Sequence, residues 1–128
     1  MIGGRYVPFG RLWRTGANEP TTLITTGPLE VAGILVPAGR SSLYTVPGPE
    51  TWEIILNRSV SQWGIESEYT DAVKAGELGR AILRSETTPT SLERLTLLVE
   101  PEANGQGVDL LIRWETTEVR IPILPASR

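Results

Sequence analysis

The 128-residue chain contains no cysteine and no histidine. Without cysteine, disulfide bonds, thiol nucleophiles, thiolate metal sites and iron–sulfur clusters are excluded. Without histidine, a Ser-His-Asp triad, a histidine general base and the usual zinc sites are excluded. Acid–base chemistry would have to use Glu, Asp, Tyr or the single lysine, Lys74. A metal ion would need oxygen ligands, and with only two Asp no dense acidic loop stands out. We therefore expect no metal site and no cofactor.

A long apolar run and a basic surface are also missing. The chain has no apolar segment of bilayer-spanning length, and its first residues, MIGGRYVPFG, lack the pattern of a secretory signal. The net charge is -3 and the isoelectric point about 5.0, which argues against nucleic-acid binding. The length, the 40% hydrophobic content and a mean hydropathy of -0.07 are typical of one globular domain, here residues 1–128.

The apolar residues that are present follow a period of two. Alternating residues share one face of a strand, and four runs have this pattern: TWEIILN, ERLTLLVE, VDLLIRWE and TEVRIPIL. Turn signals rich in Gly and Pro separate the runs; they are Thr26-Gly27-Pro28, Ala32-Gly33, Pro37-Ala38-Gly39, Pro47-Gly48-Pro49, Asn104-Gly105-Gln106-Gly107 and, without Gly or Pro, Glu115-Thr116-Thr117. We expect an all-β fold, an antiparallel β-sandwich of jelly-roll type with roughly eight strands.

Two segments carry more specific expectations. Pro122 lies inside the last run, and proline cannot donate a backbone hydrogen bond, so this strand is expected at a sheet edge. The polar stretch from Glu66 to Gly79 departs from the strand pattern. It is expected to be a long loop or to hold a helical turn after Thr70, and loops often carry function.

The stretch RLWRTGANEPTT, residues 11–22, is the first candidate site. In one interpretation Arg14 and Glu19 pair in a buried polar corner, with Asn18 satisfying nearby backbone groups. In the other, Arg14 binds an anionic or carbonyl group, Asn18 adds a hydrogen bond and Glu19 acts as acceptor or base. The sequence leaves both interpretations open, because structural ion-pair networks resemble sites.

The four tryptophans divide into two pairs. Trp52 and Trp114 lie on alternating apolar faces and are expected in the core. Trp13 and Trp63 lie in polar, loop-like contexts, where an aromatic ring can stack on a flat ligand or cap the core. Arg40, Tyr44 and Asn57 belong to strand-like stretches and, together with Arg14 and Glu19, could line one sheet face or pocket. The full set of ligand-binding candidates is Trp13, Arg14, Asn18, Glu19, Arg40, Tyr44, Asn57 and Trp63.

Several stretches together resemble one bacterial family, the domain of unknown function 2911. They are VPFGRLWRTGANEPT, VAGILVPAGRSSLYTVPG, WEIILNR with SQWG, and IRWETTEVRIPI, in the family's order. The resemblance implies a small β-rich domain and no particular function. Members usually carry an upstream segment, often behind an export signal or lipid anchor, whereas this chain opens almost on the motif. Loss of upstream strands would leave an open sheet edge, which is a template for pairing with another chain.

Three functions are compatible with these features. The first is a non-enzymatic module that binds a small molecule, a glycan or a peptide. The second is a small hydrolase, lyase or isomerase in which Glu19 or Glu115 is the acid or base and Arg14 stabilises negative charge. The third is a structural domain that self-associates, as a homodimer, through an open sheet edge. The compartment is left open by the sequence.

Overall fold

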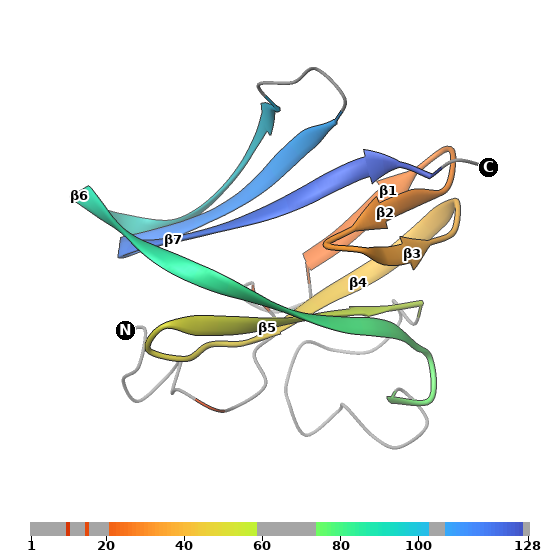
Figure 1. Ribbon diagram of the computed structural model, residues 1–128, viewed down its shortest axis with the longest axis horizontal. Coiled ribbons are helices and arrows are strands. Elements are labelled where there is room, and N and C mark those ends of the chain that lie inside the picture. Colours follow the sequence, from red (N-terminus) through yellow and green to blue (C-terminus); the bar gives the residue numbers. More distant parts are fainter. Residues whose placement is uncertain (1–9, 11–14, 16–20, 59–73, 103–106, 127–128) are drawn as a thin grey trace.

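The computed structural model describes residues 10, 15, 21–58, 74–102 and 107–126, and within these it is an antiparallel all-β protein. Its seven strands form one hydrogen-bonded sheet in the order β1-β4-β5-β6-β7-β2-β3 (Figure 1). The strands are β1 (Thr21–Thr25), β2 (Leu29–Val31), β3 (Ile34–Val36), β4 (Gly39–Val46), β5 (Thr51–Asn57), β6 (Glu77–Pro101) and β7 (Val108–Pro125). The predicted all-β class is confirmed, while the sandwich or jelly-roll arrangement stays a prediction.

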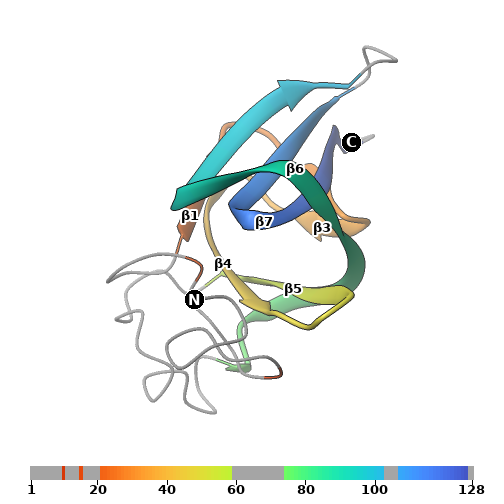
Figure 2. The same cartoon turned by 90° about the vertical axis from the view of Figure 1, so that its left-hand side faces the viewer.

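The sheet curls over because β6 belongs to both of its halves. The first part of β6 pairs with β5, from Thr51 opposite Arg84 to Asn57 opposite Glu77. The later part, from Ser85 onward, pairs with β7. β6 therefore passes from the β1-β4-β5 half to the half that contains β7, and the two halves face each other (Figures 1 and 2).

β7 folds back on itself at the predicted Glu115-Thr116-Thr117 turn. Glu115 has a φ of 54°, a left-handed conformation that marks a turn in a non-glycine residue. The arms before and after the turn lie side by side (Figure 1), and the ion pair between Arg113 and Glu118 joins them. The turn signal was therefore correct, although the element is continuous.

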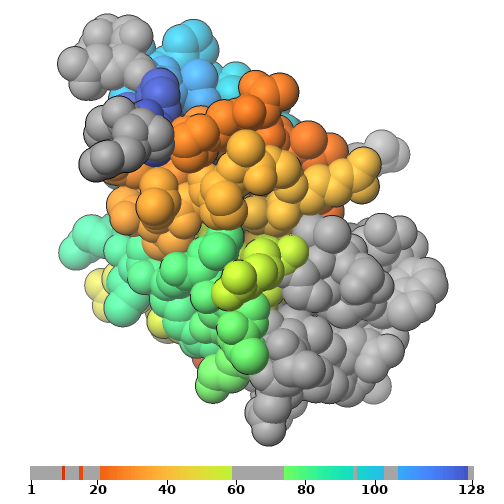
Figure 3. Space-filling model, turned by 90° about the vertical axis from the view of Figure 1, so that its right-hand side faces the viewer, coloured from red at the N-terminus to blue at the C-terminus, as the bar shows by residue number. Residues whose placement is uncertain are grey.

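The hairpin of β2 and β3 closes one side of the molecule. Ala32 and Gly33 both have positive φ, 51° and 82°, as a two-residue turn of type I′ requires. β3 then lies against the start of β6, where these segments are neighbours on the surface shown in Figure 3. A Cβ at Gly79 would lie 3.0 Å from Ile34 Cγ2, so glycine permits this close approach.

The core lies between the two halves of the curled sheet. The period-two pattern predicted its members: Trp52, at 1% exposure, is buried, and Trp114 packs against the core from a partly buried position. The Trp114 indole also donates a hydrogen bond to the Glu93 carbonyl at 3.0 Å. The buried core residues are Val31, Ile34, Val36, Leu43, Trp52, Ile54, Leu56, Ile112, Val119, Ile121 and Ile123.

Two expectations from the sequence are corrected. Pro122 is not on an edge strand, because β7 lies between β6 and β2. Proline is tolerated at this position because the pairing of β7 with β2 ends beside it, at Ile123 opposite Val31. The Pro122 carbonyl accepts a hydrogen bond from the Ala32 backbone amide at the β2–β3 turn. In the 66–79 stretch, residues 66–73 lie outside the described residues, and residues 74–76 form a turn that fits the expectation of a helical turn or loop. The correction concerns the end of the stretch, which is strand because β6 already begins at Glu77.

Candidate functional site

Five of the eight candidate residues lie outside the described part of the chain. They are Trp13, Arg14, Asn18, Glu19 and Trp63. Within the opening stretch, Thr15 is described and fully buried. Its hydroxyl lies 3.1 Å from the Thr45 hydroxyl, and its carbonyl accepts a hydrogen bond from the Thr21 hydroxyl at 2.7 Å. Thr15 is thus tied to β1 and β4, and the choice between site and corner stays a prediction.

The other three candidates share one face of the β4–β5 pair. Arg40 and Tyr44 have the same parity along β4, and Asn57 is the Cα partner of Ser42, which lies between them. Tyr44 and Asn57 have 0% exposure, whereas Arg40 is exposed. The Ser42 hydroxyl donates to the Asn57 carbonyl at 3.3 Å. These three residues therefore share a face, but two of them are buried; whether Arg14 and Glu19 lie beside them stays a prediction, because both lie outside the described residues.

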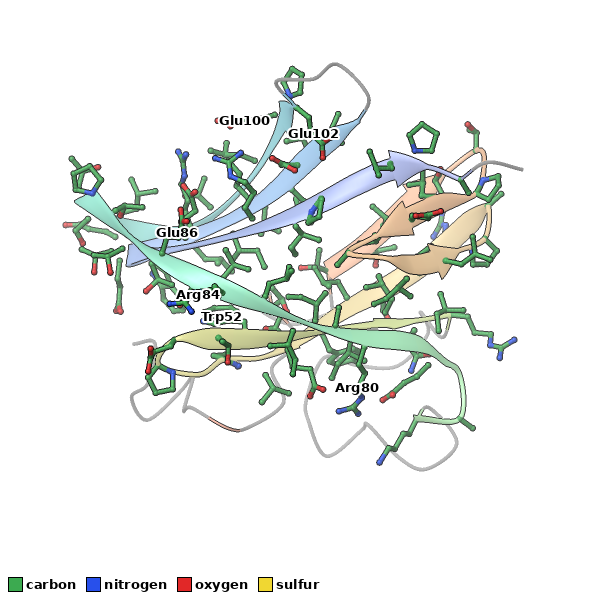
Figure 4. The ribbon with its side chains drawn as sticks, viewed as in Figure 1. Trp52, Arg80, Arg84, Glu86, Glu100 and Glu102 are labelled. Carbon is green, nitrogen blue, oxygen red and sulfur yellow. The ribbon has the colours of Figure 1, made fainter. Side chains whose placement is uncertain are left out.

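A shallow groove lies at the far end of that same face. It has a volume of about 460 Å³ and is lined by Gly10, the Pro47-Gly48-Pro49 turn, Val46, Thr51, Glu53 and Ile82. Arg80 lies beside Glu53 at 3.1 Å and Glu77 at 2.7 Å, pointing to the opposite side of the sheet from Trp52 (Figure 4). Its hydrogen bond to Glu77 raises the pKa of Arg80 further above its ordinary value. Arg80, which bonds the Glu53 side chain of the groove lining, is thus committed to two carboxylates.

A deeper and more apolar pocket opens on the other face, between the two halves of the sheet. Its volume is about 240 Å³. Among the described residues that line it, none is charged and none is aromatic; they are Thr21, Thr22, Leu23, Val31, Leu43, Leu56, Leu97, Val99, Leu110, Ile121 and Ile123. We call this the aliphatic pocket.

Exposure distinguishes the mouth of the aliphatic pocket from its floor. Val99 and Leu97 on β6 are 64% and 38% exposed, and Thr22 on β1 is also exposed. Leu56 and Ile121, at 1% and 0%, belong to the buried core. The pocket therefore runs from a mouth between β1 and the later part of β6 down to side chains of β5 and β7. In the described part of the sheet, β1 and β6 are not hydrogen-bonded neighbours.

Charged side chains gather on the outer face of β6 and β7. Glu118 is 8% exposed and accepts a hydrogen bond from Arg113 at 2.7 Å, with Arg120 at 3.5 Å. Arg120 also reaches Asp109 at 2.9 Å and Glu100 at 3.5 Å. Each arginine bridges several carboxylates, so this cluster can stabilise the fold without an external ion. Within the described segments, no group of acidic side chains is arranged to hold a metal ion.

A pair of carboxyl groups lies at the end of this charged cluster. Partial removal from water and a hydrogen bond with Asp109 raise the pKa of Glu102 above its usual value. A hydrogen bond between two carboxyl groups requires a proton on one of them. Asp109 therefore favours the protonated form of Glu102. Glu100 lies near the end of β6, and Glu102 is the first residue after that strand (Figure 4).

The aliphatic pocket was not among the sites predicted from the sequence. Two of its mouth residues, Leu97 and Val99, had been assigned to one face of a strand, and this is correct because they pair with Ile112 and Leu110. The sequence offers no sign that β1 contributes to a pocket, because its segment TTLIT is short and uncharged. Nothing in the local pattern indicates that it lies across from β6, since that depends on the curl of the whole sheet.

Comparison with known families places the chain in one of them. The model of the family described as protein of unknown function (DUF2911) matches residues 1–123, so the chain belongs to this family and the resemblance noted from its motifs is confirmed. No curated protein and no solved structure matches the chain. The described part of the chain also contains no helix of the length and apolarity needed to cross a membrane.

Proposed function

We propose that this protein is a non-enzymatic binding module whose aliphatic pocket takes a small apolar molecule. The observation that carries the proposal is a 240 Å³ pocket lined by apolar side chains from six strands and opening at the surface. Ligand sites are typically concave and mainly apolar. The pocket is somewhat smaller than the usual range, which begins near roughly 300 Å³, so its ligand is expected to be small.

The size of the pocket argues against a simple packing defect. Protein cores rarely contain voids much larger than a water molecule. A closed, dry cavity of 240 Å³ would cost on the order of 6 kcal/mol at about 24 cal/mol per Å³. Because the mouth admits water, the actual cost is smaller, but it remains large beside a typical stability of about 5–15 kcal/mol. An apolar ligand offsets this cost by covering the exposed core side chains.

The lining of the pocket favours binding over catalysis. An enzyme that lacks histidine needs an isolated carboxylate or a comparable group inside a concave site. The described residues of the pocket offer only two threonine hydroxyls beside nine aliphatic side chains. Glu115, one of the two acids named for the catalytic alternative, is at the β7 turn and does not line the pocket. The described residues therefore support a binding module.

The test is a titration of the labelled protein with small apolar molecules, followed by NMR. A panel of 1-octanol, cyclohexanol, benzene and naphthalene covers chain and ring shapes. We expect at least one member to shift the methyl resonances of Leu56, Leu110 and Ile121 saturably. A panel that leaves all three unchanged at its solubility limit would contradict the proposal.

A matched pair of variants then links binding to the pocket. Val99, 64% exposed, is at the mouth, and Leu35, 62% exposed, is on β3 and does not line the pocket. Val99→Trp should obstruct the mouth and lower affinity at least tenfold, because a bulky ring replaces a small side chain. Leu35→Trp should bind as the unmodified protein does. Both variants should unfold within a few degrees of the original, since neither residue is buried.

A further inference from the structure

The ligand class of the aliphatic pocket follows from its lining and shape; this inference rests on the proposed function. We infer that the pocket takes an unbranched aliphatic chain of about eight carbons, end first, with the polar end of the ligand left at the mouth. The carrying observation is the gradient from the exposed Val99 and Thr22 to the buried Leu56 and Ile121 within one uncharged pocket.

The floor of the pocket selects for a chain. Its side chains are Leu, Ile and Val from β2, β4, β5 and β7, and no described lining residue has a ring. Flat aromatic ligands gain specific affinity from stacked or edge-to-face rings, which these side chains cannot supply. Methylene groups need only dispersion contact and removal from water. An aliphatic chain therefore uses the whole lining, whereas an aromatic ring does not.

The volume sets the length of the chain. A water molecule takes about 30 Å³ of liquid, so 240 Å³ holds roughly eight groups of that size. A methylene group is similar in size to a water molecule, which gives a chain of about eight carbons. Carbons beyond that number would extend past Val99 into solvent and add little.

The mouth accepts a polar end without demanding a charge. Thr21 and Thr22 supply the hydroxyl groups of the lining. The Thr21 hydroxyl already donates to the Thr15 carbonyl, which leaves its oxygen as an acceptor. Arg113 and Arg120 lie on the outer face of the sheet and are engaged by carboxylates. An acid and an alcohol of equal chain length are therefore expected to bind alike.

The experiment is a chain-length series measured by isothermal titration calorimetry on the full chain. The series is 1-butanol, 1-hexanol, 1-octanol, 1-decanol and 1-dodecanol, with octanoate added and naphthalene as a ring of comparable volume. We expect affinity to rise about fourfold per methylene up to about eight carbons and then to level off. Octanoate should bind within about threefold of 1-octanol, and naphthalene at least tenfold more weakly.

The outcomes separate this inference from the proposed function. Naphthalene binding as tightly as 1-octanol, or no dependence on chain length, overturns the chain assignment while the pocket remains a binding site. Octanoate binding more than tenfold tighter than 1-octanol overturns the neutral mouth. Binding of none of these molecules, and of none in the NMR panel, removes the proposed function itself. Loss of the length dependence in Val99→Trp, with Leu35→Trp unchanged, confirms that the chain enters at this mouth.

Discussion

The outer faces of the β4–β5 pair and of the β6–β7 pair accommodate their polar side chains in different ways. Both pairs turn their inner faces to one core. On β4 and β5 the outer face is buried as well: Ser42, Tyr44, Ile55 and Asn57 are all at 0% exposure. On β6 and β7 the outer face is charged and only partly open: Asp109 and Glu118 are nearly buried, and partly exposed arginines bridge them to each other and to Glu100.

The difference shows where polar residues are costly. A buried polar group must be hydrogen-bonded, and Ser42 meets this by donating to the Asn57 carbonyl. Ion pairs between exposed groups contribute little individually, about 0–1 kcal/mol, and depend on salt; the pairs of Asp109 and Glu118 each join a nearly buried carboxylate to a partly exposed arginine and are expected to contribute somewhat more. The fold therefore depends on close packing at the outer face of β4 and β5, and on a charge network of modest strength at that of β6 and β7.

The largest expected effect comes from truncating the buried outer face. Ile55→Ala removes a fully buried side chain from the outer face of β5 and should lower the free energy of unfolding by about 2–5 kcal/mol. Leu98→Ala is the matched change on the outer face of β6, where the side chain is 37% exposed; it should cost clearly less, about 1 kcal/mol or below. Urea denaturation of both variants measures the difference. Equal losses would mean that the two outer faces are not distinct.

The sequence predicts much of this contrast but not all of it. In TWEIILN the period-two pattern predicted the buried inner face with Ile54, whereas the burial of Ile55 and Asn57 on the outer face was not predicted. In VDLLIRWE the alternation predicts one charged face, and Arg113 and Asp109 lie there. Local patterns and turn signals therefore identify the strands and their faces.

What the sequence does not supply is the position of distant strands relative to one another. The aliphatic pocket exists because β1 and the later part of β6 approach each other across the curled sheet. The place of Pro122 in an interior strand likewise depends on where the β2 ladder ends. Such features depend on long-range pairing and register, which no window of a few residues contains. The same holds for Tyr44, since a polar-aromatic residue in a strand predicts neither burial nor exposure.

A second prediction concerns the strength of the charge network. Glu118→Gln keeps the size of a side chain that is 10% exposed but weakens its contacts with Arg113 and Arg120. Charge-assisted hydrogen bonds are stronger than neutral ones, so we expect a loss of about 1–2 kcal/mol at low salt and a smaller loss in 1 M NaCl. The matched variant Glu100→Gln changes a 43% exposed partner of the same arginines and should cost under about 0.5 kcal/mol. A loss for Glu118→Gln that is insensitive to salt would assign the effect to packing.

The smallest effect is expected from the pH dependence of the carboxyl pair at the end of β6. The pKa of Glu102 is raised from its ordinary 4.5 in the folded protein by partial loss of water and by the hydrogen bond to Asp109. The folded state therefore binds the proton more tightly than the unfolded state, and stability falls as the pH rises from about this ordinary value through the raised one.

Glu102→Gln mimics the protonated acid and should abolish this part of the fall, so its advantage in stability over the original protein grows from pH 4 to pH 7. Thermal unfolding across this range measures the advantage, with Glu50→Gln in the exposed β4–β5 turn as control. An advantage that is the same at every pH would show that the charge of Glu102 is not what opposes folding, and the charged outer face would then owe its stability to the arginine bridges alone.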